Sequence, residues 1–207
     1  MKKVLFTVLL VVLGMVGYGQ MLGKIKASQM INYKTINVVL DVTYNEQSNL
    51  LYLEVDGSKD DVYICLDYSA KIKVMSYILK CKEWCHKCDS AKLYNTSKEL
   101  GNIITSAGFT HFDNTYICDN VPVQFQLDTF WDKNKSVDCN LSLFVPELFA
   151  DDNKYINVES KMVFIDKTEL DNFYKILDTG IIRYKEKKKN DSIFLIENKK
   201  KVDDILK

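Results

Sequence analysis

Residues 68–100 contain neither glycine nor proline, and runs of alternating apolar and polar residues lie on both sides of this segment. Because Ala, Lys, Leu, Glu and Met are frequent in it, the segment predicts a long helix over residues 69 to about 92. Alternation with a period of two residues is typical of strands that bury one face. The chain must therefore combine a long helix with two groups of strands.

Seven short segments have this strand pattern. They are residues 36–44, 50–55 and 62–66 before the helix, and residues 116–118, 123–127, 137–145 and 156–165 after it. Short polar turns join the first three, which predicts an antiparallel meander.

A second helix is predicted near the carboxyl terminus. Asp166 and Glu169 have the spacing of a capping box, the apolar residues that follow have helical spacing, and Gly180 is expected to end the helix. The order of strands, helix, strands and helix is typical of the α+β class. We expect antiparallel β-sheet packed against one long central helix and a shorter C-terminal helix.

The amino terminus has the features of a secretory signal. Lys2 and Lys3 precede an uncharged stretch over residues 4–19, and small residues stand at Gly17 and Gly19. The expected cleavage lies between Gly19 and Gln20. We therefore expect an exported protein, periplasmic or extracellular, that touches the membrane only through its signal before cleavage. The predicted parts are a signal peptide (1–19), a single α+β domain (20–184) and a lysine-rich tail (185–207).

The net charge of the chain limits the classes of partner that it is expected to bind. Removal of Lys2 and Lys3 with the signal leaves 26 basic against 28 acidic side chains, a net charge of about −2. A nearly neutral domain has no electrostatic preference for nucleic acid. We expect an unknown protein or a small ligand as the partner, and the sequence indicates no cofactor.

Three of the six cysteines crowd into residues 81–88, and this segment fits more than one kind of site. Trp84, Cys85 and Cys88 resemble the Trp-Cys-x-x-Cys of thioredoxin-like oxidoreductases, in which the first cysteine lies at a helix amino terminus and attacks disulfides. The predicted helix, however, begins more than ten residues before this motif.

A metal site is a second interpretation of the same segment. The spacing of Cys81, Cys85 and Cys88 resembles that of radical S-adenosylmethionine enzymes, although Lys87 replaces the aromatic residue usual before the third cysteine. The three thiols could also bind zinc, but His86 points away from them on a continuous helix, so a distant residue such as Cys65 would have to complete the site.

Packing explains the three cysteines without a ligand. At about 100° per residue, Cys81, Cys85 and Cys88 fall in the same stripe of the helix as Val74 and Ile78. Cysteine packs well as a small apolar side chain. We therefore expect this face to lie on the sheet. If any disulfide forms, the two strand cysteines Cys118 and Cys139 are the pair most free to form it.

The layout of the chain resembles that of small exported proteins of unassigned function from Gram-negative gut bacteria. The resemblance rests on the signal ending at Gly19-Gln20, on Lys82-Glu83-Trp84 in the long helix, and on residues 166–170 after a late strand. It implies no activity and no site residues. We expect an exported, noncatalytic binding domain with no catalytic, cofactor or metal residues. The alternative is a periplasmic thiol-disulfide oxidoreductase that uses Cys85 and Cys88.

Overall fold

The computed structural model describes residues 19–31, 34–55, 60–131, 137–151 and 153–205, with side chains as far as Ile196. The predicted signal peptide, apart from Gly19, lies outside the described residues. Eight strands close into a barrel in the order β1-β10-β7-β6-β5-β4-β3-β2, and every neighbouring pair is antiparallel. These strands are β1 (Gly19–Ile31), β2 (Lys34–Asn45), β3 (Leu50–Val55), β4 (Val62–Leu66), β5 (Ser97–His111), β6 (Asn114–Trp131), β7 (Val137–Val145) and β10 (Lys161–Asp166). A separate pair of short strands, β8 (Leu148–Ala150) and β9 (Asn153–Val158), lies between β7 and β10 in the sequence.

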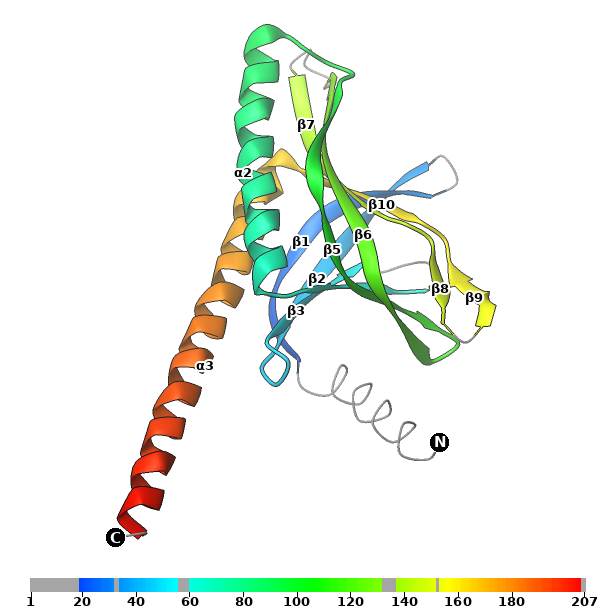
Figure 1. Ribbon diagram of the computed structural model, residues 1–207. Coiled ribbons are helices and arrows are strands. Elements are labelled where there is room, and N and C mark those ends of the chain that lie inside the picture. The colour runs from blue at the N-terminus through cyan, green and yellow to red at the C-terminus, as the bar shows by residue number, and fades with distance from the viewer. Residues whose placement is uncertain (1–18, 32–33, 56–59, 132–136, 152, 206–207) are drawn as a thin grey trace.

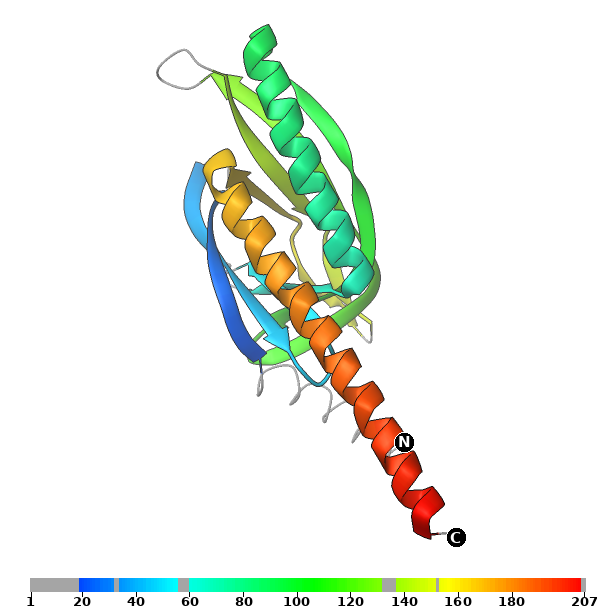
Figure 2. The same ribbon diagram turned by 90° about the vertical axis from the view of Figure 1, so that its left-hand side faces the viewer.

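Two helices lie side by side along one side of the barrel (Figures 1 and 2). The first, α2 (Tyr68–Ala91), begins at Asp67, whose carboxylate accepts a hydrogen bond of 2.7 Å from the Ala70 backbone N–H. This satisfies one of the free N–H groups of the first turn. The second, α3 (Leu170–Ile205), follows the short 3₁₀ helix η1 (Lys167–Glu169) and extends past the strands toward the carboxyl terminus.

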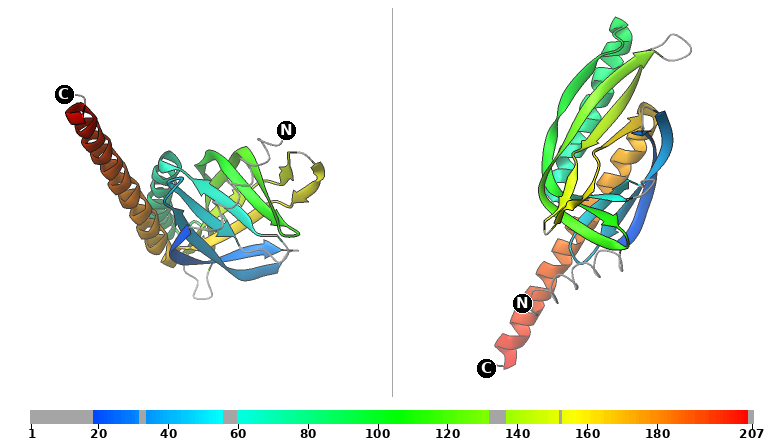
Figure 3. Two further views of the ribbon diagram at one scale, coloured as in Figure 1. Left: turned by 90° about the horizontal axis from the view of Figure 1, so that it is seen from below. Right: turned by 90° about the vertical axis from the view of Figure 1, so that its right-hand side faces the viewer.

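The core lies between the inner face of the strands and the two helices. Along β7, Cys139, Leu141 and Leu143 are fully buried, whereas the residues that alternate with them point to the outer face. From α2, Tyr77 packs on Phe125 of β6, with ring centroids 5.3 Å apart. Seen from below and from the far side, the helices lie on one side of the strands (Figure 3). No helix of the described residues covers the opposite side of the strands.

The fold class predicted from the sequence is confirmed, because antiparallel strands pack against two helices. The bounds of β3, β4 and β7 agree with the predicted strands. Among the described residues no helix has the length and apolar character needed to cross a membrane.

The C-terminal helix differs from the prediction, because it is longer than α2 and continues through Gly180. A Cβ atom at Gly180 would lie 2.9 Å from Cδ1 of Leu51 in β3. The glycine therefore allows α3 to approach the strands closely rather than ending the helix. As a result, part of the predicted tail belongs to a helix that is continuous with the domain.

Candidate functional site

The cysteine segment of the sequence lies in the interior of α2, far from the start of the helix. Cys81 and Cys85 are buried against the sheet, and Cys88 is half-buried. Cys85 forms a disulfide with Cys139 of β7, with the two Cα atoms 5.9 Å apart. The bond joins the helix to the sheet, and Cys88 is a free thiol. The alternative oxidoreductase would require Cys85 to pair with Cys88, and the structure does not contain this pair.

The predicted pairing of Cys118 with Cys139 is wrong. On β6 the residue opposite Cys139 is Thr129, which is eleven positions beyond Cys118. At about 3.3 Å per residue this corresponds to roughly 35 Å along the strand. The Cys118 thiol instead donates a hydrogen bond of 3.1 Å to the carbonyl oxygen of Phe149.

Burial raises the pKa of two free thiols. It raises the pKa of Cys81 and of Cys65 to about 12, so both are protonated near neutral pH. The described residues include no group of three or more His, Cys, Asp or Glu side chains that could hold a metal ion. His86 is exposed on α2. The predicted alternative metal ligands Cys81, Cys85 and Cys88 are thus divided between two free thiols and a disulfide.

A buried lysine lies where both helices meet the turn between β2 and β3. Lys71 of α2 is fully buried, and its Nζ lies 3.5 Å from the carbonyl oxygen of Asn49. The same Nζ lies 5.6 Å from the ring centroids of Tyr44 and Tyr184. Burial lowers the pKa of Lys71, and the charge of Asp67 partly opposes this shift. With no exposed surface, Lys71 connects α2 to α3 and is closed to ligands.

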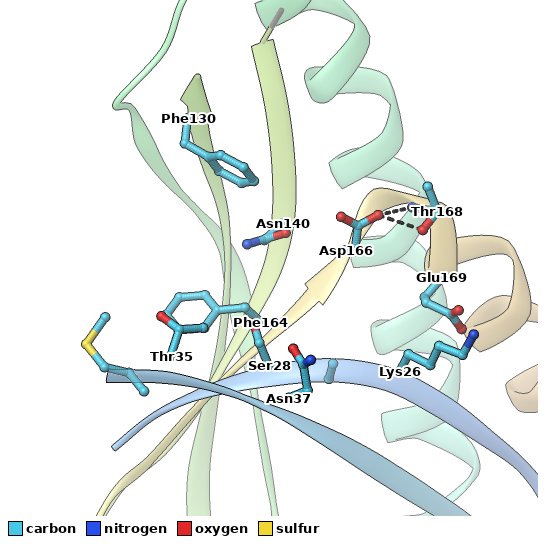
Figure 4. A pocket seen from close by; sticks show the side chains of 12 residues that line it. Lys26, Ser28, Thr35, Asn37, Phe130, Asn140, Phe164, Asp166, Thr168 and Glu169 are labelled. Carbon is cyan, nitrogen blue, oxygen red and sulfur yellow. Dashed lines mark hydrogen bonds between the residues drawn. The ribbon is translucent and has the colours of Figure 1, made fainter. Parts of the chain in front are cut away.

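A hollow of about 640 Å³ opens on the outer face of the strands, where the β1–β2 hairpin runs across β6 and β7 (Figure 4). We call it the outer-face pocket. The residues that line it and carry the argument below are Ser28, Asn37, Phe130, Asn140 and Phe164. Its volume lies within the range of about 300–1,000 Å³ that is typical of small-molecule sites.

Strand register brings these side chains together. Ser28 of β1 lies opposite both Asn37 of β2 and Phe164 of β10, so the three form one row across neighbouring strands. Same-face neighbours in such a row are about 5 Å apart. Asn140 of β7 lies opposite Asp166 of β10, two residues further along β10 than Phe164. In Figure 4 the two amides approach the hollow from different strands, and the two rings lie on one side of it.

Among the described residues, polar side chains around the pocket form hydrogen bonds or ion pairs, whereas three that line it, Ser28, Asn37 and Asn140, do not. Asp128 on the outer face accepts hydrogen bonds from Ser97, Gln126 and Ser142. Asp138 forms an ion pair of 2.7 Å with Lys167. Within the described part of the chain, the side chains of Ser28, Asn37 and Asn140 make no hydrogen bond to another residue. Their donors and acceptors are therefore available to a ligand.

Charged groups stand at one side of the pocket, where β10 leads into η1. Lys26, Asp166 and Glu169 line this side (Figure 4). The Asp166 carboxylate accepts hydrogen bonds from the backbone N–H (2.7 Å) and the hydroxyl (2.6 Å) of Thr168, which hold the start of η1. Glu169 accepts a hydrogen bond of 3.1 Å from the amide of Asn172. Both carboxylates thus have local structural partners.

Comparisons with known proteins give this chain no relatives. No protein-family model matches it, and searches of curated proteins and of solved structures found no significant match. The function must therefore be inferred from the geometry of the chain itself.

Proposed function

We propose that this protein is an exported, noncatalytic binding domain that holds a small polar ligand in the outer-face pocket. The observation that carries the proposal is the convergence of Ser28, Asn37 and Asn140, all without side-chain partners in the described part of the chain, beside Phe130 and Phe164. Polar groups with free donors and acceptors, placed beside aromatic rings in one hollow, can fix the orientation of a ligand.

Two further features support export and a binding role. The signal-like amino terminus predicts secretion, and a disulfide such as Cys85–Cys139 persists in oxidising compartments. The two carboxylates beside the pocket already accept hydrogen bonds from Thr168 and Asn172. These hydrogen bonds favour a structural role for Asp166 and Glu169 over a role in acid–base catalysis.

A thermal-shift screen tests the binding role. The purified mature chain is heated with a library of sugars, amino acids, nucleotides and organic acids. A ligand that binds only the folded state raises the melting temperature, by about 2 °C or more once its concentration greatly exceeds Kd. We expect at least one such compound, with its effect lost in Asn140→Ala and kept in Asn102→Ala, an exposed asparagine on β5. If no compound stabilises the protein, or if Asn140→Ala responds like the wild type, the proposal is wrong.

An insulin-reduction assay tests the noncatalytic part separately. We expect no disulfide reduction above background, because Cys85 is held in a bond to Cys139 and Cys81 is a buried, protonated thiol. Reduction by the wild type that disappears in Cys85→Ser would contradict the proposal and favour a thiol oxidoreductase.

A further inference from the structure

The outer-face pocket presents neutral hydrogen-bonding groups on more than one strand. The amides of Asn37 and Asn140 each offer a donor and an acceptor, and the hydroxyl of Ser28 offers both on one atom. A ligand satisfies all three most fully when its own neighbouring groups both donate and accept. Adjacent hydroxyl groups have this property.

The charges beside the pocket do not select an ion. Lys26, Asp166 and Glu169 all line this side of the pocket, so both signs of charge are present, and the two carboxylates accept hydrogen bonds from Thr168 and Asn172. Sites for phosphate or carboxylate ligands gather several cationic donors, which the lining of this pocket does not. The single cationic side chain of the described lining disfavours an anionic ligand, and the hydrogen-bonded carboxylates are less available to a cation, so we infer a neutral ligand.

Two aromatic rings add an apolar surface to this polar lining. Phe164 stands in the same row as Ser28 and Asn37, and Phe130 lies on the neighbouring part of the wall (Figure 4). Both rings are half-buried, so one part of each is fixed in the fold and the rest faces the hollow. Such a ring packs against a flat apolar face, which the C–H groups of a sugar ring provide.

The groups that the pocket offers are side chains on the face of the sheet. Peptides that add to a sheet pair instead with an exposed strand edge. β2 pairs with β3 only over Leu40–Asn45, so among the described residues its Lys34–Val39 part has β1 as its strand partner. Because Ser28, Asn37 and Asn140 line the hollow with their side chains, we infer a ligand that binds through side chains.

We propose that the ligand of the outer-face pocket is a neutral saccharide of one or two rings, held by Asn37, Ser28 and Asn140 with its apolar face on Phe130 and Phe164. This proposal rests on the proposed function and specifies its ligand class. The row from Asn37 to Phe164 spans two strand spacings, about 10 Å, which suits a ligand of this size.

Isothermal titration of the mature protein tests the ligand class. The neutral probes are glucose, galactose, N-acetylglucosamine, maltose and cellobiose. The charged probes are glucose 6-phosphate, glucuronate, glutamate and lysine. We expect at least one neutral sugar to bind more tightly than every charged probe. Asn37→Ala, Asn140→Ala and Phe130→Ala should each weaken that sugar about tenfold, the effect of one lost hydrogen bond or ring contact.

Asn102→Ala is the matched control and should bind the sugar like the wild type, and circular dichroism checks that each variant is folded. Tighter binding of a charged probe, sensitive to Asn140→Ala, would overturn the saccharide proposal and leave the binding function standing. Sugar binding that none of the three pocket variants weakens would overturn it as well. Failure of every probe to bind would also overturn it, whereas the wider thermal-shift screen decides whether the pocket binds another class of ligand.

Discussion

Replacement of Cys85 and Cys139 by alanine should remove a large part of the stability of this protein. The disulfide joins residues separated by 54 positions. Closing a loop of that length lowers the entropy of the unfolded chain, and the chain-entropy relation gives a stabilisation of about 4 kcal/mol at 25 °C. Since small domains are stable by only about 5–15 kcal/mol, this loss would be severe.

Guanidinium denaturation of the double variant and the wild type, without reductant, measures this difference directly. Dithiothreitol should lower the stability of the wild type by a similar amount and leave the double variant unchanged. Cys88→Ala, which removes a half-buried free thiol of the same helix, is the control and should cost far less. A thiol titration of the unfolded, unreduced wild type should find four of the six cysteines free. Six free thiols, or a double variant as stable as the wild type, would refute the reasoning.

Three further predictions concern the buried groups of the fold. Iodoacetamide at about pH 8 should label Cys88 before Cys81, because burial protects the Cys81 thiol and raises its pKa to about 12. Peptide mass spectrometry that finds Cys81 labelled first would contradict this prediction. Burial lowers the pKa of Lys71 from its ordinary value of 10.5, so the cost of its charge is present at neutral pH and falls as the pH rises through the folded-state pKa. In urea denaturation between about pH 7 and pH 10, the unfolding free energy of the wild type should therefore increase relative to that of Lys71→Met. A difference between the two proteins that does not change with pH would contradict this prediction. Gly101→Ala should cost about 1–3 kcal/mol, because Gly101 has φ 143° and a Cβ there would lie 2.6 Å from Oη of Tyr77; an unchanged melting temperature would disprove the clash.

The sequence predicted the strands whose buried face alternates clearly, and it missed β5 and β1, in which the alternation is interrupted or weak. In β5, the register shifts beside Gly101 and again between Thr105 and Ala107, so period-two reading fails there although pairing with β6 continues. In β1, Ile25 and Gln29 are the fully buried positions among the described residues of the strand, which leaves too little apolar alternation to recognise. At Gly180, a residue that often ends helices serves instead for close packing.

The candidate site shows the same limit. Alternation over residues 36–44 and 137–145 places Asn37 and Asn140 among the polar residues of their strands, and in the structure both line the outer-face pocket. Nothing in the sequence could show that these two strands contribute to one pocket, because β1 and β10 lie between them and β1 was not predicted. Likewise, helical spacing placed Cys85 against the sheet but could not identify Cys139 as its partner, since that choice depends on which strand lies under α2.

The central claim, that the outer-face pocket is where this protein binds its ligand, can be tested most directly by ¹H–¹⁵N NMR of the side-chain amides. Each asparagine side chain gives a pair of NH₂ signals, and the single variants Asn37→Ala, Asn140→Ala and Asn102→Ala assign the pairs by their loss. We expect the best ligand of the thermal-shift screen to shift both pairs at the same concentration, while the pair from Asn102 stays in place. Signals of Asn37 and Asn140 that do not move at saturating ligand, with shifts elsewhere in the protein, would contradict the claim.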